Sequence, residues 1–248
     1  MQRLGLIGGT GLDHFGKAVR THDIDSSYGR PSAKLAEYHI GQSQVFFLPR
    51  HGEQHETPPH AVNYRANIDA FRQLKVEGIV AVNAVGGISN PHKPGALSLP
   101  DQLIDYTWGR EHTFSMLAGD ELEHVEFAGP FDGHVRAGLL RAAATAGIVM
   151  ADGGCLGVTQ GPRLETAAEI RKFKQDGCAL VGMTSMPEAS LAREAGLDYA
   201  SLCIIANWGA GLELEPVTMA AIETTLAHAM IEVRKLLGQF FEEFSNDH

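Results

Sequence analysis

The sequence alternates short apolar runs with longer stretches in which apolar residues recur every three or four positions. The first short run, at 4–7, ends in a glycine cluster, and the runs at 79–85 and 199–206 also stop at glycine or polar residues. Short apolar runs are typical of buried strands, and the longer periodic stretches are typical of amphipathic helices. Their alternation predicts an α/β fold.

The same pattern predicts the individual elements. Strands are expected at 4–7, 34–40, 45–48, 79–85, 102–107, 156–160, 179–183 and 199–206, and helices at 63–76, 134–146, 165–175, 187–194 and 216–244. Residues 110–130 have little periodicity and are expected to cross the surface as irregular chain. Since no repeat or linker divides the chain, we expect a single domain over residues 1–248.

Charge and cysteine content exclude several classes of protein. The 248 residues carry a formal net charge of −10, which disfavours nucleic acid and acidic membranes as partners. Three cysteines, an odd count in a chain of this length, argue against a disulfide framework and for a reducing compartment. The first residues lack the pattern of a signal peptide, and no apolar stretch approaches the ~20 residues of a membrane span. We therefore expect a cytoplasmic protein.

A glycine cluster, GGTG at 8–11, directly follows the first predicted strand. Its backbone N–H groups and the Thr10 hydroxyl can donate hydrogen bonds to an anion. A Rossmann dinucleotide site is the familiar alternative, but the third glycine of G-x-G-x-x-G is absent. A simple tight turn is the other interpretation that these residues leave open.

Arg50 and His51 follow the predicted strand at 45–48. Arginine offers a planar fork that matches phosphate oxygens, and His51 can add a further donor, although a solvated loop would also carry such residues. His51 and His55 are four residues apart, a spacing found in zinc sites. However, Gly52 and the prolines at 58–59 argue against a helix there, and no third ligand follows. We therefore expect no metal.

Four further segments carry polar groups at predicted strand ends or in the loops that follow. They are 83–87 with Asn83 and Ala84, 161–166 with Glu165, 182–188 with Met183 and Thr184, and 206–211 with Asn207. Each has an ordinary structural interpretation, such as an acidic residue in the first turn of a helix for Glu165. Because ligands collect outside the carboxyl ends of strands in open α/β sheets, the coincidence of several such ends favours an oxyanion site.

Taken in order, these segments resemble the trimeric purine nucleoside phosphorylase and methylthioadenosine phosphorylase family. IGGTG, RHG, VNAVGG, GPRLET, GMTSMPE and the apolar strand before Asn207 occur in the family's order, and the resemblance covers nearly the whole chain. It implies a mixed central sheet flanked by helices, a homotrimer and no cofactor. It also implies phosphorolysis of a nucleoside's N-glycosidic bond, with inorganic phosphate as co-substrate.

The resemblance also implies roles for individual residues. Phosphate would be held by Thr10, Arg50, His51, Ala84 and Thr184, with Asn83 beside it, and Met183 would pack on the base or sugar. Bond breaking leaves positive charge on the ribosyl carbon and negative charge on the purine. A phosphate fixed beneath that carbon and a donor at purine N7 would stabilise these charges.

The expected base pocket departs from the methylthioadenosine branch. That branch has Asp at the position of Asn207 and again at that of Gly209, with Trp208 lying between them in this chain. An Asn amide can instead serve N7 and a 6-oxo group, as in the purine nucleoside branch. Glu165 falls where that branch has a Glu, which would accept the N1–H that adenine lacks. An unpaired Glu facing adenine would cost about 1–3 kcal/mol, so Asn207 and Glu165 are the expected catalytic pair for a 6-oxopurine.

The residues expected at the 5′ end of the nucleoside indicate a different preference. Where the purine nucleoside branch offers a His to the 5′-hydroxyl, the PVTM run at 216–219 places Met219, whose thioether packs well on a methylthio group. His124 resembles a residue that reaches the 5′ pocket of a neighbouring subunit. We therefore expect a purine salvage reaction that converts 5′-methylthioinosine to hypoxanthine and 5-methylthioribose 1-phosphate.

Four other functions stay open at this point. Two are close: a methylthioadenosine phosphorylase with an unusual base pocket, and an inosine or guanosine phosphorylase. An NAD-binding oxidoreductase would explain GGTG but not Arg50 and His51. A nucleoside-binding protein without catalysis is the fourth.

Overall fold

The computed structural model describes residues 2–115, 124–213 and 218–244. One sheet of 11 strands runs through it, in the order β2-β3-β4-β1-β5-β10-β9-β7, with β11 beside β5 and then β6 and β8. The strands are β1 (Gln2–Gly8), β2 (Arg20–His22), β3 (Leu35–Ile40), β4 (Ser43–Pro49), β5 (Gly78–Gly87), β6 (Leu97–Leu99), β7 (Gln102–Asp105), β8 (Met150–Asp152), β9 (Cys155–Val158), β10 (Cys178–Gly182) and β11 (Asp198–Trp208).

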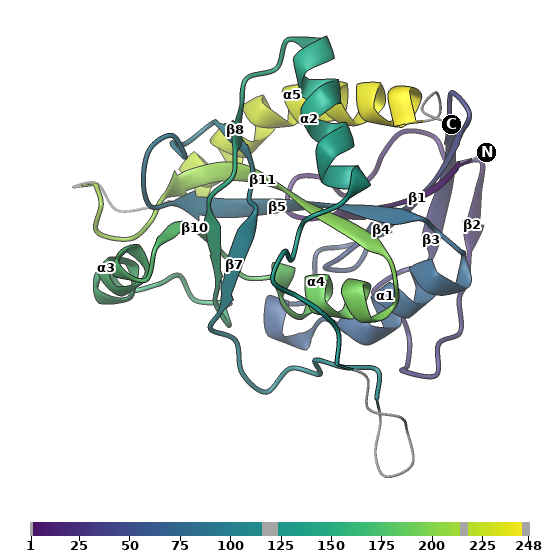
Figure 1. Cartoon of the computed structure of the whole chain (residues 1–248), viewed down its shortest axis with the longest axis horizontal. Coiled ribbons are helices and arrows are strands. Elements are labelled where there is room, and N and C mark those ends of the chain that lie inside the picture. The colour runs from purple at the N-terminus through teal and green to yellow at the C-terminus, as the bar shows by residue number, and fades with distance from the viewer. Residues whose placement is uncertain (1, 116–123, 214–217, 245–248) are drawn as a thin grey trace.

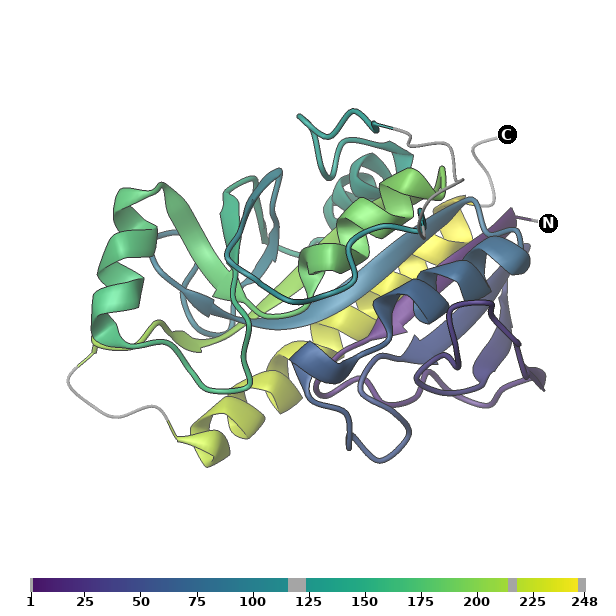
Figure 2. The ribbon, with the colours of Figure 1, turned by 90° about the horizontal axis from the view of Figure 1, so that it is seen from below.

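Helices cover both faces of this sheet. They are α1 (Tyr64–Gln73), α2 (His134–Ala146), α3 (Ala167–Gln175), α4 (Ser185–Glu194) and α5 (Met219–Phe244), with a 3₁₀ turn η1 (Pro59–Ala61). Figure 1 shows α2 and α5 above the central strands and α1 and α4 below them, and Figure 2 shows α1 and α4 from their own side. In the part of the chain that is described, no helix is long and apolar enough to cross a membrane.

The core has two main halves, one on each face of the sheet. Along β5, Val80 and Val82 pack with residues of α2 and α5, whereas Ile79 and Ala81 pack with residues of α1 and α4. This alternation follows from the two-residue period of a strand. Because both faces are covered, β5 is apolar along its length apart from Asn83.

The direction of the strands changes at β5. Strands β1, β4 and β11 run parallel to one another and to β5, whereas β10 runs antiparallel to β5 and pairs with it at Leu180–Gly87 and Val181–Gly86. The carboxyl ends of the two groups of strands therefore approach each other around Val85 and Gly182. Such a change of direction is where ligands collect in open α/β sheets.

The predicted α/β fold with a mixed central sheet is confirmed. The strands predicted at 34–40 and 45–48 are confirmed as the antiparallel pair β3 and β4, and so is the helix at 134–146, which Gly147 ends with a left-handed φ of 67°. The short strands β2, β6 and β8 were not expected, because three residues are too few to show a period. The predicted start of the last helix at 216 lies outside the described residues.

Three predicted helix boundaries were wrong. The helix predicted at 187–194 begins at Ser185. The helix predicted at 63–76 ends at Gln73 and has Asn63 as its N-cap. The helix predicted from Glu165 begins at Ala167, because the Thr166 side chain accepts from the Glu169 N–H in a capping box. Glu165 therefore lies before the helix, and its interpretation as an ordinary acid in a first turn was wrong.

Candidate functional site

A cavity of about 570 Å³ lies where the two groups of strands meet. Residues from the ends of β1, β4, β5, β10 and β11, from the loop before α3 and from the start of α5 line it. Ten of the residues expected from the sequence are among them: Thr10, Arg50, His51, Asn83, Ala84, Glu165, Met183, Thr184, Asn207 and Met219. The expected meeting of the strand ends is therefore observed.

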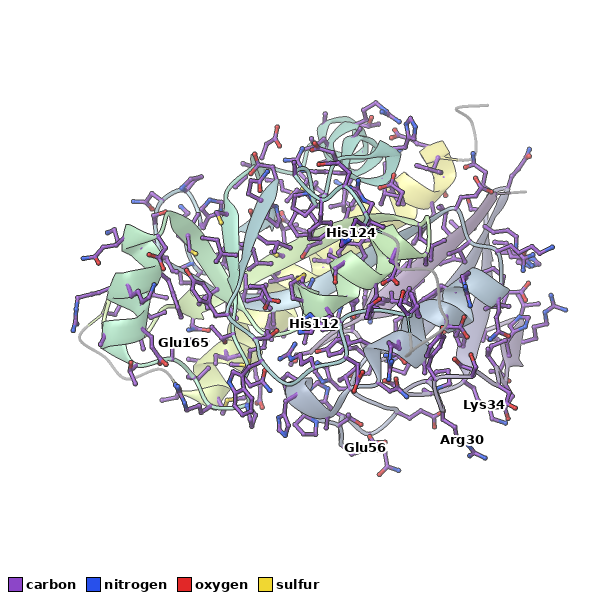
Figure 3. All side chains as sticks on the ribbon, turned by 60° about the horizontal axis from the view of Figure 1, so that its bottom comes forward. Arg30, Lys34, Glu56, His112, His124 and Glu165 are labelled. Atoms are coloured by element: carbon purple, nitrogen blue, oxygen red, sulfur yellow. The ribbon has the colours of Figure 1, made fainter. Side chains whose placement is uncertain are left out.

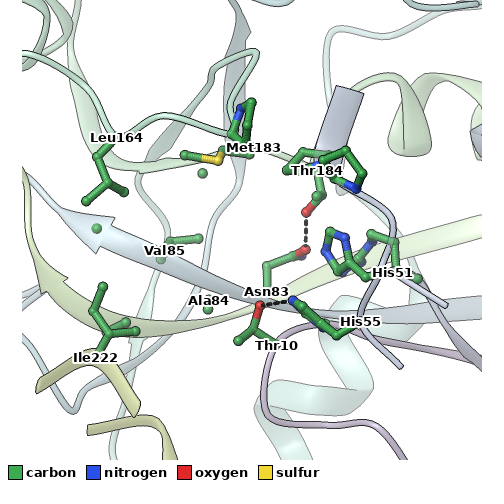
Figure 4. Close-up of a pocket in the computed structure, with 18 of the residues that line it drawn as sticks. Thr10, His51, His55, Asn83, Ala84, Val85, Leu164, Met183, Thr184 and Ile222 are labelled. Carbon is green, nitrogen blue, oxygen red and sulfur yellow. Dashed lines mark hydrogen bonds between the residues drawn. The ribbon is translucent and has the colours of Figure 1, made fainter. Parts of the chain in front are cut away.

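The cavity has a polar half and an apolar half, which Figure 4 shows side by side. The labelled polar side chains are those of Thr10, His51, His55, Asn83 and Thr184, and the labelled apolar ones are those of Val85, Leu164, Met183 and Ile222. A small anion fits the chemistry of the first half, and a flat heterocycle fits the second.

A buried ion pair supports the polar half. Arg50, only 1% exposed, donates from Nε and Nη2 to the two carboxylate oxygens of Glu188 in α4, at 2.8 and 2.9 Å. Its Nη1 donates to the Val82 carbonyl oxygen at 3.1 Å. Since a guanidinium has five N–H groups, two stay available to an anion in the cavity.

The residues around Arg50 stabilise its ion pair with Glu188 and leave room for it. Burial alone lowers the pKa of Arg50, but the Glu188 carboxylate outweighs burial and raises it. Tyr199 of β11 donates to Glu188 Oε2 at 2.8 Å, so the carboxylate is held from two sides. A Cβ on Gly9 would lie 2.5 Å from the Val82 oxygen and 2.9 Å from Arg50 Nη1, so only glycine lets the three groups meet.

A second chain of hydrogen bonds fixes the rest of the polar half. Thr184 Oγ1 donates to Asn83 Oδ1, and Asn83 Nδ2 donates to Ser201 Oγ, both at 2.8 Å. Asn83 Nδ2 also donates to the Ala81 carbonyl oxygen. The Asn83 side chain thereby orients Thr184 at the start of α4.

His51 differs from its expected role as a hydrogen-bond donor. Burial, and then the nearby charge of Arg50, lowers the pKa of His51 to about 4. The neutral ring donates from Nδ1 to the Thr57 carbonyl oxygen at 2.8 Å, so its Nε2 carries a lone pair. His51 therefore offers an acceptor to the cavity, suited to a P–OH group and not to a bare phosphate oxygen.

His55, dismissed above as a metal ligand, lies beside His51 with the ring centroids 4.7 Å apart. Its Nε2 is 3.5 Å from Thr10 Oγ1. Its spacing from His51 was the signal in the sequence, although the interpretation as a zinc pair was the one considered. In the described residues, no group of three or more His, Cys, Asp or Glu side chains is arranged to hold a metal.

Glu165 brings a carboxyl group to the cavity. Thr159, the residue after β9, donates its hydroxyl to Glu165 Oε1 at 2.7 Å. Burial raises the pKa of Glu165, although the Thr159 hydrogen bond acts in the opposite direction. The carboxyl group therefore takes up a proton at a higher pH than an exposed glutamate would.

Asn207 brings an amide to the cavity from the end of β11. Its Nδ2 donates to the Trp208 carbonyl oxygen at 2.7 Å, which fixes the plane of the amide. One N–H and the amide oxygen then stay available to a ligand.

Three expected site residues lie outside the cavity lining. Trp208 is partly buried next to Asn207 but does not line the cavity, and Gly209 packs against α3, where a Cβ would lie 3.0 Å from the Ile170 side chain. His124 is exposed, and Figure 3 shows it well apart from Glu165. Its role across a subunit boundary stays a prediction.

Arg110 was missed because it lies in the irregular segment and belongs to no motif. It is 8% exposed and donates to the carbonyl oxygens of Met183 and Gln160, both at 2.9 Å, and to that of Thr159 at 3.3 Å. These acceptors belong to the segments that follow β9 and β10. Arg110 therefore holds together the two loops that carry Glu165 and Met183.

This chain is similar to known proteins in sequence and in structure. The model of the phosphorylase superfamily matches residues 3–242. A Xanthomonas campestris pv. campestris protein named probable S-methyl-5′-thioinosine phosphorylase is 48% identical over 95% of this chain and 96% of that protein. The S-methyl-5′-thioadenosine phosphorylase of Thermofilum pendens is 38% identical over 95% of this chain and 90% of that protein. The structure of methylthioadenosine phosphorylase from Schistosoma mansoni in complex with adenine has a TM-score of 0.95 at 32% identity, covering 100% of this chain and 93% of that one.

The buried ion pair predicts a large effect on stability. Glu188→Gln leaves the Arg50 charge buried without its partner, and we expect it to lower the free energy of unfolding by about 3–5 kcal/mol. Urea denaturation measures this. Asp23→Asn, which breaks the exposed pair with Lys34, is the control and should leave the midpoint unchanged. Replacing both Arg50 and Glu188 with Met should cost less than Glu188→Gln alone; a Glu188→Gln protein as stable as the wild type would contradict this account.

Proposed function

The chain belongs to the phosphorylase superfamily, and on that premise we propose that it cleaves 5′-methylthioinosine with phosphate. The products are hypoxanthine and 5-methylthioribose 1-phosphate, which makes the chain a pentosyltransferase of purine salvage. The observation that carries the choice of base is the Glu165 carboxyl, which is partly buried and which no cation pairs with across the described cavity lining. The name of the Xanthomonas relative supports the same substrate.

In this proposal the polar half holds phosphate without a net positive charge. Among the described residues that line it, Arg50 is the only arginine or lysine and is paired with Glu188, and His51 is neutral. Two guanidinium N–H groups, the Thr10 hydroxyl and the backbone N–H groups near Ala84 and Thr184 are the donors, and the start of α4 adds its positive dipole end. His51 accepts from the protonated oxygen of the phosphate.

The base is recognised by a donor–acceptor match. A 6-oxopurine has an N1–H, which an ionised Glu165 accepts, whereas adenine presents a bare N1 lone pair there. A buried carboxylate facing that lone pair costs about 1–3 kcal/mol, or roughly tenfold or more in kcat/KM. Met183 packs on the ring or the sugar.

Asn207 assists the leaving group in this proposal. As the glycosidic bond breaks, negative charge moves onto the purine and positive charge onto the ribosyl carbon. The free Asn207 N–H donates to N7 of the departing anion, and the amide oxygen accepts from N7 once that atom carries a proton. The phosphate below the sugar stabilises the opposite charge and attacks the anomeric carbon.

The remaining parts of the proposal concern the 5′ end and the assembly. Met219, at the first turn of α5, lines the cavity and is 63% exposed. Its thioether would pack on the methylthio group. We further propose a cytoplasmic homotrimer of single-domain chains (1–248), in which His124 closes the 5′ pocket of a neighbour and no cofactor or metal takes part.

A comparison of three substrates tests the proposed function. Steady-state kcat/KM is measured for 5′-methylthioinosine, 5′-methylthioadenosine and inosine with phosphate. We expect methylthioinosine to be preferred over methylthioadenosine by at least tenfold because of Glu165, and over inosine because of Met219. A preference for methylthioadenosine would contradict the role of Glu165, and a preference for inosine would contradict that of Met219.

The pH dependence of base selection gives a sharper prediction. Since burial raises the pKa of Glu165, its protonated form accumulates at a higher pH than that of an exposed glutamate and can then donate to adenine N1. The ratio of kcat/KM for methylthioinosine over methylthioadenosine should be high above this pKa and fall as the pH drops through it. Both substrates share the 5′ group, so only the base affects the ratio.

Glu165→Gln is the matched variant for this experiment. Glutamine offers an N–H and an oxygen at every pH, so the ratio should fall by roughly tenfold or more at neutral pH. It should also lose its dependence on pH. If the wild-type ratio of kcat/KM values is as independent of pH as that of the variant, Glu165 does not face N1.

A further inference from the structure

Two cysteines lie opposite each other on neighbouring strands outside the cavity. Cys155 begins β9 and Cys178 begins β10, and the two are register partners in this parallel pair. Neighbouring strands lie about 4.8 Å apart, which is within the roughly 4.4–6.8 Å that separates the Cα atoms of disulfides. The backbone therefore satisfies the first geometric condition for a bond between these residues.

The two side chains occupy the same face of the sheet. Cys178 Sγ lies 3.1 Å from the position that a Cβ on Gly157 would take. Gly157 is two residues after Cys155, so both point to the same face of β9. Because Gly157 has no side chain, the Cys178 sulfur has room over β9, on the face of the strand that Cys155 also occupies.

The surroundings of the pair favour one thiolate. The hydrogen bond from Cys155 is the main cause that lowers the pKa of Cys178 to about 7, and the Tyr106 hydroxyl, 3.9 Å from Cys178 Sγ, also lowers it while burial opposes. The interaction with Cys178, and then burial, raises the pKa of Cys155. The thiolate is the reactive form of cysteine, so near neutral pH the pair holds a nucleophile next to a thiol.

The third cysteine has none of these features. Cys203 is fully buried in β11, and burial raises its pKa to about 12. It is therefore an inert thiol and a matched internal control.

We propose that Cys155 and Cys178 form a redox-active dithiol site that a hydroperoxide converts to an intramolecular disulfide. The Cys178 thiolate attacks one peroxide oxygen, the O–O bond breaks, and with a proton the other oxygen leaves as water. The Cys155 sulfur then attacks the sulfenic acid at Cys178 Sγ, the S–O bond breaks, and a second water leaves. In total, two thiols and one hydrogen peroxide give one disulfide and two waters.

This site is independent of the proposed catalytic function. Neither cysteine lines the cavity, and both lie at the strand ends opposite Val158 and Gly182, which lead into it. Cys155 is partly exposed, so a molecule as small as hydrogen peroxide can reach the pair from its side. A thiol reductant restores the two thiols.

Thiol counting and peptide mapping test the site on the full chain. The reduced protein is treated with hydrogen peroxide and denatured, and its free thiols are counted. We expect the count to fall from three to one, with a peptide that links Cys155 to Cys178, and to return to three after dithiothreitol. In the Cys203→Ala variant, the number of free thiols should fall from two to none, and the same peptide should link Cys155 to Cys178.

The Cys155→Ser variant distinguishes a site in which the two cysteines act together from two thiols that react independently. In this variant no disulfide should form, and Cys178 should be trapped as a sulfenic acid by dimedone. The proposal is overturned if the wild type keeps three thiols at a peroxide concentration that oxidises free cysteine. It is equally overturned if the link involves Cys203, joins two chains, or is replaced by sulfinic acid.

Discussion

The pairing of Arg50 with Glu188 constrains the rest of the site. It joins the end of β4 to α4 across a buried space, with Tyr199 of β11 and the Val82 carbonyl oxygen of β5 completing the contacts. Two charges in such a place are tolerated only because each has its partner and its hydrogen bonds. The pair therefore determines how four elements meet, and with them the position of every polar group around the expected phosphate.

This constraint produces a polar half that is rich in donors but has little net charge. In the proposed function, oriented N–H and O–H groups would bind phosphate there, and the neutral His51 would accept from a protonated phosphate oxygen. On the other side of the cavity, Glu165 is an acceptor that no cation of the described lining pairs with. In the proposed function, selection of the base depends on whether N1 of the ring carries an N–H for Glu165, because leaving that carboxylate unmatched costs free energy.

Much of this site could be predicted because the strand ends carry local signals. Apolar runs that stop at GGTG, at Arg50 and at Gly86-Gly87 indicate where backbone and side-chain donors gather, whatever the rest of the fold. The same reasoning could not find Glu188, an ordinary acid in a helix whose partner is 138 residues away in the sequence. Arg110 lies in a segment without periodicity, so its contacts with the Met183 and Gln160 carbonyl oxygens exist only once the loops are folded.

Other differences between the predicted and the observed site arise from burial and strand register, which cannot be read directly from a sequence. The acceptor role of His51 depends on burial beside Arg50 and on the Thr57 carbonyl oxygen. Gly209 stands two residues from Asn207, yet it packs on Ile170 because β11 ends there against α3. The pairing of Cys155 with Cys178 depends on the register of β9 and β10, and a shift by one residue would place the side chains on opposite faces.

The central claim is that one cavity holds phosphate in its polar half and a keto purine against Glu165 and Asn207 in the other. A crystal structure of the protein with hypoxanthine and phosphate tests it most directly. We predict phosphate within hydrogen-bonding distance of Arg50 and Thr184, N1 of the purine against the Glu165 carboxylate, and N7 against the Asn207 amide. A purine whose N1 faces solvent, or a Glu165 side chain turned away from the ring, would contradict the account.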